Sequence, residues 1–452
     1  MNIFLPKKKK NKIKQNFLSL QLRLKRPKLF PLLQRRSTRA HQLRTSCLRW
    51  FSLSEIGAMS DSNKSIRWGY LPDEILTHIF TFLPIKSTII CTSVSKTWKS
   101  LIQNPTFIST HLHHSHNKNQ NNLRLLILLR NDKEVYTLHK EDDDPDFTEY
   151  TSFESPFHAP APGFHEVVGT CNGLLCLSYS LPKHFEEIFL WNPCVRKFLQ
   201  LPSPNVTFDT YDKSLKSFGF GFDPKTNDYK VVRILSLPRS RDDFGMSRPR
   251  VDVYSLSTGE WRMLSASASL PPTCAITSHR PPAFASGALH WIAVTATGDK
   301  KRFVLVFDLG DEVFHQILLP ELPSYTGKMM WTHVYVYWNS IAGFQRRVEN
   351  GQINIWVMKE YGVASSWTKF SHQCPILGMP YTFPIGFRRN GEVILLNMGS
   401  ELVSWNPDSQ NIKNLEINGD IHTLCGSYVE SLVLFDKATK GVVTYWGKTE
   451  NR

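Results

Sequence analysis

The sequence lacks the features of a membrane or secreted protein. No run of eighteen apolar residues is present, so no transmembrane helix is expected. No signal-peptide core follows Met1. The eight cysteines are scattered, and none forms a Cys-x-x-Cys pair. This usage suits a reducing compartment, where thiols pack as small hydrophobic groups. We therefore expect a protein of the nucleus, the cytoplasm or both, without a membrane partner.

Acidic residues are absent from the first 54 positions, which contain fifteen Lys and Arg. The formal net charge of +15 therefore belongs to this leader, and the rest of the chain has 39 residues of each sign. The folded part has no net basic bias, so no nucleic-acid partner is expected. Because fifteen like charges cannot pack into a core, we expect a disordered basic leader at residues 1–60.

The leader allows three interpretations. "PKKKKNK" at Pro6–Lys12 resembles a nuclear import patch. The longer acid-free, Arg-rich stretch resembles an organelle transit peptide. A plain disordered extension also fits, as does an upstream stretch that is not always translated, because "MSDSNKS" from Met59 offers an alternative start.

Catalytic motifs are missing as well. No Gly-x-Ser-x-Gly, His-Glu-x-x-His or phosphate-loop pattern occurs, and "GFGFD" at Gly219–Asp223 has no third glycine opening a helix. "HLHHSHNKNQNN" at His111–Asn122 indicates a polar linker, and no second Cys or His cluster has metal-ligand spacing. Cys171 and Cys176 flank a strand and are expected to be buried. We expect no catalytic residue, no metal and no cofactor, and so a protein that is not an enzyme.

One stretch, Trp68–Pro105, has a helical pattern. Pro72 suits the first turn of a helix, and Asp73 and Glu74 suit its positive end. An apolar stripe follows at Ile75, Leu76, Ile79, Phe82 and Leu83, and Pro84 ends the helix. Further short helices are predicted through "KSTIICTS" and from Val94 to Ile102. Three helices this short cannot cover all their apolar surface, which predicts a partner or another domain.

These residues resemble an F-box of the plant type. The Leu-Pro start, "LPIKS", "VSKTW" and the "NPTF" exit carry the resemblance, which places an F-box at residues 66–112. In that family the motif binds the Skp-type adaptor of a cullin-RING ubiquitin ligase. By motif position, the resemblance implies adaptor-facing residues at Leu71, Pro72, Ile75, Leu76, Ile79, Leu83, Pro84, Ile85, Val94 and Trp98.

The F-box resemblance has one departure and leaves one alternative. Family members often carry basic residues before "VSK", whereas this chain has "TIICTSVSK". That difference affects peripheral contacts and leaves the apolar anchors in place. For Val94 and Trp98, the alternative is that they only hold the three helices together.

After a linker at residues 113–122, the pattern changes from helical to alternating. Short strands are predicted wherever β-branched and aromatic residues alternate between turn signals such as "CNGL", "DPKTND" and "STGE". These strands are "LRLLILLR", "YKVVRIL", "VDVYSL", "FVLVFDL", "INIWVM", "EVILLNM" and "SLVLFD". Asp223, Asp228, Asp252 and Asp308 follow or end strands, where capping of turns is their expected role.

A weak repeat indicates a β-propeller. A strand ending in an aromatic residue recurs about every fifty residues, at Trp191, Tyr254, Phe307, Trp356 and Trp405. Such a period is kelch-like, and each four-stranded blade must stack on its neighbours. About six blades are expected, and five or seven are the alternatives. Partial strand sets near Leu123–Tyr136 and Tyr428–Trp446 would close one of them.

The repeat region also resembles the F-box-associated domain of plant F-box proteins. "GTCNGLLCL", "LWNPCVRKFLQLP", "FGFGFDPKTNDYKVVRI", "VYSLSTGEWR" and "ALHWIAV" carry this resemblance, and the domain is placed at residues 123–446. The tryptophans are expected in blade cores. A target site is expected on loops at one face, with Pro238–Arg250 and Lys328–Trp331 as candidates.

The two resemblances together imply the substrate-recognition subunit of a Skp–cullin–F-box ubiquitin ligase. The F-box would bind the adaptor, and through it a cullin, while the propeller would bind a target protein that the sequence does not identify. One alternative is a kelch-like protein-binding scaffold without a ligase role. Another is a glycan- or small-molecule-binding enzyme, for which the sequence shows no clustered carboxylates.

Overall fold

The computed structural model describes much of the chain after the leader. The described residues are 72–117, 123–130, 133–141, 146–157, 165–180, 186–204, 215–236, 249–264, 274–276, 280–295, 301–320, 329–347, 353–370, 382–420 and 422–436. The chain divides into two compact units. The helical unit comprises the chain up to Leu83 together with Ile90–Ile102, and the propeller unit comprises Pro84–Ile89 and everything from Gln103 onward.

Four helices are described before the first strand. They are α3 (Asp73–Thr81), α4 (Ile85–Cys91), α5 (Lys96–Ile102) and α6 (Pro105–Asn117). The first three correspond to the three short helices expected from the sequence.

The fourth helix, α6, was not expected. Asn104 and Pro105, which follow the last of the predicted helices, begin this one. The side-chain oxygen of Asn104 accepts a hydrogen bond from the Thr106 amide (2.8 Å), and proline is favoured at the first helical position. Phe107, Ile108 and His111 are buried on one face. Residues 113–117, expected in a polar linker, therefore continue a helix that is held by packing.

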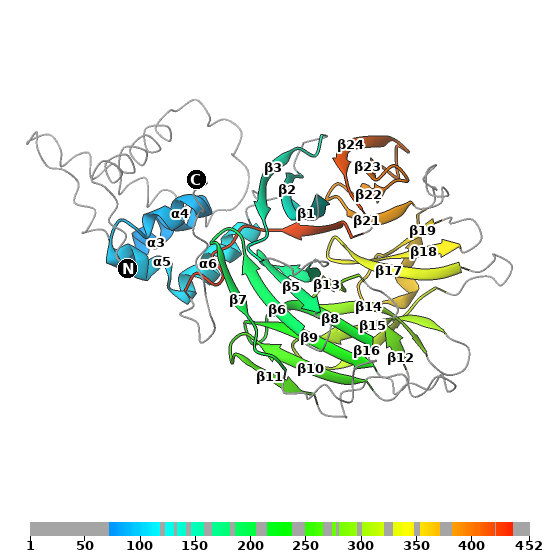
Figure 1. The fold of residues 1–452 in the computed structure, drawn as a ribbon, viewed down its shortest axis with the longest axis horizontal. Coiled ribbons are helices and arrows are strands. Elements are labelled where there is room, and N and C mark those ends of the chain that lie inside the picture. Colours follow the sequence, from blue (N-terminus) through cyan, green and yellow to red (C-terminus); the bar gives the residue numbers. More distant parts are fainter. Residues whose placement is uncertain are drawn as a thin grey trace, which may run out of the picture. The chain divides into compact units, whose positions relative to one another are not determined.

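The strands form six sheets, each a blade of a β-propeller (Figure 1). Blade 1 has the order β25 (Leu424–Tyr428), β1 (Leu123–Arg130), β2 (Lys133–Lys140) and β3 (Glu149–Glu154). Blade 2 consists of β4 (Glu166–Cys171), β5 (Leu174–Ser180), β6 (Glu186–Asn192) and β7 (Lys197–Gln200). Blade 3 consists of β8 (Leu215–Asp223), β9 (Asp228–Ser236), β10 (Arg250–Ser255) and β11 (Glu260–Met263).

The remaining blades follow the same up-and-down order. Blade 4 consists of β12 (Cys274–Ile276) and β13 (Ala283–Ala285), which both pair with β14 (Ala288–Thr295), then β15 (Arg302–Asp308) and β16 (Phe314–Leu318). Blade 5 consists of β17 (Met329–Tyr337), β18 (Ser340–Arg347), β19 (Ile353–Met358) and, after the short 3-10 helix η5 (Ala364–Ser366), β20 (Trp367–Lys369). Blade 6 consists of β21 (Phe383–Phe387), β22 (Val393–Leu396), β23 (Glu401–Trp405) and β24 (Ile412–Asn418).

The ring is closed by a strand from the far end of the chain. β25 pairs antiparallel with β1, with Leu123 opposite Tyr428 and Ile127 opposite Leu424. In Figure 1 the orange-red β25 lies beside β1. β25 also contacts β4 and β21, the inner strands of blades 2 and 6. The expectation of about six blades, with one closed by both ends of the repeat region, is confirmed.

Two details of the predicted closure were wrong. The closing strand is Leu424–Tyr428, which overlaps the expected Tyr428–Trp446 only at its last residue, and residues 437–446 lie outside the described part. "SLVLFD" (Ser431–Asp436) forms a turn, not a strand. Its apolar side chains are nevertheless buried, and its carbonyl oxygens accept hydrogen bonds from Asn192 and Lys197. Here side-chain packing, not strand pairing, accounts for the apolar pattern.

The recurring aromatics occupy one structural position. They lie on the third strand, counted outward from the centre, of blades 2 to 6: Trp191, Tyr254, Phe307, Trp356 and Trp405. In blades 2, 3 and 4 this residue is directly opposite another aromatic on the outermost strand, as in the pair Phe307 and Phe314. Trp191, Trp291 and Trp405 are buried, whereas Trp261 and Trp356 are half-buried.

The core lies between neighbouring blades. One buried cluster joins Leu125 and Tyr136 of blade 1 to Trp191 of blade 2, and similar clusters lie between blades 3 and 4, 4 and 5, 5 and 6, and 6 and 1. Each sheet is therefore covered only when its neighbours are present. "GFGFD" serves this packing, because a Cβ on Gly221 would lie 2.5 Å from the Phe284 ring of the next blade, and one on Gly219 would lie 2.7 Å from Leu289.

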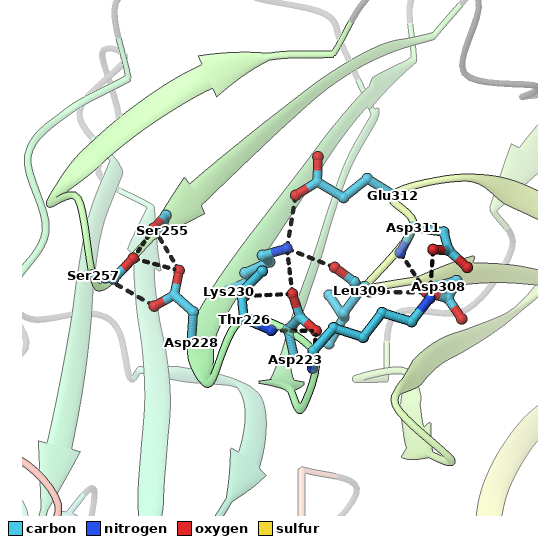
Figure 2. A network of polar contacts seen from close by, with 12 residues as sticks. Asp223, Thr226, Asp228, Lys230, Ser255, Ser257, Asp308, Leu309, Asp311 and Glu312 are labelled. Carbon is cyan, nitrogen blue, oxygen red and sulfur yellow. Dashed lines mark hydrogen bonds and ion pairs between the residues drawn. The ribbon is translucent and has the colours of Figure 1, made fainter.

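A buried polar network also joins blades 3 and 4 (Figure 2). Lys230 on β9 donates to the Asp223 carboxylate (2.8 Å), to the Leu309 carbonyl oxygen (2.6 Å) and to Glu312 (2.8 Å). Burial alone would lower the pKa of Lys230, but the hydrogen bonds to Asp223 and Glu312 raise it above its ordinary value. Burial would likewise raise the pKa of Asp223, and the bonds from Lys230 and Thr226 bring it below its usual range. Both groups are therefore charged.

The turn-capping role predicted for four aspartates is confirmed for three of them and is wrong for Asp252. The side chains of Asp223, Asp228 and Asp308 cap turns by accepting backbone N–H bonds from Lys225, Ser257 and Gly310, respectively. Asp252 instead pairs with Arg233 (2.8 Å).

We predict that Lys230→Met destabilises the propeller by about 3–5 kcal/mol, because it leaves the Asp223 carboxylate buried without its cation. The measurement is the free energy of unfolding of the full chain by denaturant titration. Lys225→Met is the matched control, because Lys225 and Asp311 form an ion pair of the same network that is more than half exposed. It should change stability little. Equal losses in the two variants would contradict the assigned role of Lys230.

His290 on β14 is buried in its neutral form. Its Nδ1–H donates a hydrogen bond to the Ala283 carbonyl oxygen (2.9 Å), and its Nε2 accepts a hydrogen bond from the Tyr361 hydroxyl (2.8 Å). Burial lowers the pKa of His290 from 6.5 to about 4; the bond to Ala283 opposes this shift and nearby His315 adds to it. The unfolded chain therefore binds this proton more readily than the folded one. The stabilising contribution is complete above pH 6.5 and is lost as the pH falls toward 4.

The second prediction concerns this pH dependence. Across the window from 6.5 to about 4, protonation of unfolded His290 should cost the native protein on the order of 3 kcal/mol. His290→Gln keeps one donor and one acceptor but does not titrate. Unfolding free energies of the two proteins, measured at a series of pH values, should therefore converge as the pH falls. Parallel profiles would show that His290 does not contribute.

Candidate functional site

The helix α3 begins and ends where its sequence dictates. Pro72 has no backbone N–H that would need a partner at the start of the helix. Its carbonyl oxygen accepts hydrogen bonds from the amides of Ile75 (3.0 Å) and Leu76 (3.1 Å). Asp73 and Glu74 occupy the first turn, where negative charge is favoured by the helix dipole. The helix ends at Thr81, and Phe82 is its C-cap residue, two positions before Pro84. α3 is thus fixed in length by two prolines.

The inner side of α3 packs on α5. Phe80 and Trp98 meet edge to face with ring centroids 5.0 Å apart, and Leu76 and Ile102 are also buried. The hydroxyl of Ser95 accepts a hydrogen bond from the Trp98 backbone amide (3.1 Å) and so caps the N-terminus of α5. This side of α3 holds the helical unit together.

The outer side of α3 leaves apolar surface uncovered. Ile75, Ile79 and Phe82 follow one another at helical spacing; the two isoleucines are half-buried, and Phe82 is 49% exposed. We call these three residues the α3 ridge. Ile90, in the same unit, is 42% exposed, and Val94 is half-buried.

The residues expected to face an adaptor therefore divide into three groups. The first group is exposed or half-buried and consists of Pro72, Ile75, Ile79, Leu83, Pro84 and Val94. Fully buried in this chain are Leu76, Ile85 and Trp98. The side chains of these three residues pack within this chain, which for Trp98 fits the alternative that it holds the helices together. Contact of the three residues with an adaptor stays a prediction. Leu71 lies outside the described residues.

Two exposed apolar residues were missing from the predicted set. Phe82 belongs to the apolar stripe of α3, seven positions after Ile75, and that spacing was a usable signal. Ile90 lies among several apolar residues of α4, and spacing alone does not say which of them is exposed. Large exposed side chains of this kind, gathered on one short unit, suit a protein-binding surface.

The described cysteines are poor nucleophiles. Burial raises the pKa of Cys91 and Cys274 to about 11 and that of Cys425 to about 12, and it also raises the values of Cys171, Cys176 and Cys194. Cys171 and Cys176 are buried, as expected. A thiol held protonated at neutral pH does not form thioesters readily. In the described part of the chain, no group of three or more His, Cys, Asp or Glu is placed to bind a metal, and no helix is long and apolar enough to cross a membrane.

The propeller unit contains a cavity of about 510 Å³ at its centre. Its lining comes mainly from β1, β4, β13, β17, β21 and β25, with Ser115 and His116 from the end of α6. His116 and Asn172, at the β4–β5 turn, share a hydrogen bond of 3.1 Å. For the two loops predicted to contact a target, the structure describes only Pro249, Arg250 and the backbone of Met329–Trp331.

The third prediction separates the two sides of α3. Trp98→Ala removes the ring that packs on Phe80 and should destabilise the helical unit by about 3–5 kcal/mol. Phe82→Ser changes a side chain that is already half exposed, so it should have little effect. Hydrogen exchange of peptides from α3 and α5 is the measurement, with peptides of β14 as the internal control. Similar exchange in both variants would contradict this division.

The chain thus combines a small helical unit that exposes apolar side chains with a closed β-propeller. Residues 68–110 match the F-box domain, and residues 125–435 match the F-box associated beta propeller domain. The second match covers well over half of the chain, which therefore belongs to the F-box proteins with an F-box associated beta-propeller domain.

Relatives in Arabidopsis thaliana agree with this assignment. F-box protein CPR1 is 27% identical over 362 residues, covering 77% of this chain and 84% of the relative. F-box protein At3g07870 is 28% identical, covering 66% and 71%, respectively. F-box/kelch-repeat protein At3g23880 is 24% identical, covering 74% and 87%.

Proposed function

We propose that this chain is the substrate-recognition subunit of a Skp–cullin–F-box ubiquitin ligase. The observation that carries the proposal is the α3 ridge: Ile75, Ile79 and Phe82 lie partly open on an F-box helix whose other side is already packed. Complete burial of side chains of this size is worth roughly 1.5–3 kcal/mol each before entropic costs. A Skp-type adaptor that covered the ridge would gain part of that free energy.

The propeller supplies the second half of the proposal. A ring of blades that share buried clusters is a rigid support, and its surface turns are available to hold a target protein. The receptor then acts by holding its target near the ubiquitin-loaded enzyme, which raises the effective concentration of the acceptor lysine. This mechanism does not require a nucleophilic residue in the receptor. The high pKa values of its described thiols are consistent with that role.

The fourth prediction tests adaptor binding. Ile79→Asp and Phe82→Asp each place a charge on the ridge and should weaken capture of a purified plant Skp-type adaptor by about tenfold or more. Binding of the full chain is measured by pull-down and by calorimetry. The matched control is Ile412→Asp on β24, where the isoleucine is 39% exposed. This control variant makes the same isoleucine-to-aspartate change on the propeller, and it should bind the adaptor as the parent chain does.

The variants also need a folding control. Phe82→Asp is the more informative of the pair, because its side chain is more exposed than that of Ile79 and its loss should not disturb packing. The far-UV spectrum and the unfolding midpoint of each variant should match those of the parent. Full adaptor capture by both ridge variants would contradict the role assigned to the ridge, and no capture by the parent chain would favour the scaffold without a ligase role.

A further inference from the structure

Positive charge is concentrated in the central cavity of the propeller unit. Its lining includes Arg124, Arg280, Arg388 and Arg389, whereas Glu141 is its one carboxylate among the described residues. The chain beyond residue 54 contains equal numbers of acidic and basic residues, so this excess is a local feature. A concave site with charges of one sign and low-dielectric walls attracts groups of the opposite sign.

Glu141 holds the side chains of Arg124 and Arg388 in position. Its carboxylate pairs with Arg124 Nε at 3.2 Å and lies 3.7 Å from Arg388 Nε, and it accepts the backbone N–H of Arg389. Arg388 also pairs with Glu392 at 3.1 Å. The Glu141 and Arg388 side chains are almost fully buried. The cavity wall is therefore held in place before any ligand arrives.

The other two arginines are better exposed to a ligand. Arg280 is half-buried, and its Nη1 donates a hydrogen bond to the carbonyl oxygen of Thr423 (3.0 Å). Arg389 is exposed in the turn between β21 and β22. The planar guanidinium has five N–H donors in a fork that matches carboxylate and phosphate groups.

The same cavity is lined by an unusual aromatic residue, Trp338. Trp338 is in the two-residue turn between β17 and β18, is 63% exposed and has φ 53°. The corresponding turns of blades 2 and 4 have Asn172 (φ 51°) and Ser286 (φ 51°) at this position, each followed by glycine. A left-handed backbone at a bulky residue costs on the order of 1 kcal/mol or more. Folding alone gives no reason for an exposed, strained tryptophan, whereas an aromatic anchor for a ligand does.

We propose that this cavity binds a short acidic segment of the target protein, with carboxylate or phosphate groups against the arginines and Trp338 packed on the apolar part of the peptide. The choice of a target peptide as occupant rests on the function proposed above. A cavity of about 510 Å³ accommodates a few side chains and is too small for a folded domain. Asn172, Trp338 and Arg389 lie in turns that join the first and second strands of their blades, so they share the face through which the segment enters.

The test is selection from a synthetic library of short random peptides that contains Asp, Glu and phosphoserine with the other amino acids. Full-length protein is the bait. We expect the bound peptides to be enriched in acidic positions and to bind less tightly as salt is raised. Enrichment in Asp and Glu, or in phosphoserine, identifies which anionic group the site uses. Selection without acidic enrichment overturns the proposal, as does a failure to retain any peptide.

Affinities of a selected peptide for variants locate the site. Arg280→Gln and Arg389→Gln should each weaken binding by about tenfold or more, because a charge-assisted hydrogen bond is lost. The matched control is Arg196→Gln, an exposed arginine in the β6–β7 turn that does not line the cavity, and it should bind normally. Equal affinity of the parent, the two cavity variants and the control would place binding elsewhere and overturn the proposal.

Trp338→Ser supplies an independent readout. It copies the residue of the blade-4 turn, so it should weaken peptide binding while leaving the unfolding midpoint unchanged or higher, because a small residue fits this left-handed position better than a bulky one. A variant that binds the peptide as tightly as the parent would contradict the role assigned to Trp338. Adaptor capture should be normal in every cavity variant, so a failure here is distinguishable from a failure of the ligase assignment.

Discussion

The pairing of β25 with β1 is the constraint on which the propeller depends. Every blade has two faces, and the apolar residues of each face are covered only by the next blade, as in the cluster that joins Tyr136 to Trp191. An open row of blades would leave its two end faces and an edge strand exposed to water. By placing a strand from the end of the repeat region inside the first blade, the chain closes the ring with a continuous hydrogen-bonded sheet. Loss of that strand would uncover blades 1, 2 and 6 together.

Close approach between blades explains several sequence features that resemble functional motifs. The glycines of "GFGFD" leave room for Phe284 and Leu289 of the next blade. Lys230 bridges two blades through carboxylates and a carbonyl oxygen, in a place where a lone buried charge would be unfavourable. These contacts make the ring rigid. A rigid ring in turn can hold arginines from distant parts of the sequence around one cavity.

The helical unit shows how far a periodic pattern can locate a binding surface. The stripe on α3 predicted an apolar face, and the structure divides that face into a packed side, with Leu76 and Phe80, and an open side, with Ile79 and Phe82. Spacing along a helix gives the direction of each side chain, but it does not reveal where the neighbouring helix lies. The F-box resemblance placed Trp98 among the adaptor-facing residues, and the structure shows it buried against Phe80, whereas the exposed Phe82 was not in that set.

The sequence by itself determined the two-part architecture, the three F-box helices, six of the seven quoted strands and the strand-end aromatic residues that recur in blades 2 to 6, because these follow from local periodicity and turn chemistry. Only the tertiary structure decided which apolar segments became strands. Ser431–Asp436 has a strand-like composition, but β25 already occupies the inner position of blade 1, so this segment packs as a turn. The arginine cavity is likewise a product of tertiary structure. Arg124, Arg280 and Arg388 are far apart in the sequence and become neighbours because ring closure brings the centres of different blades together.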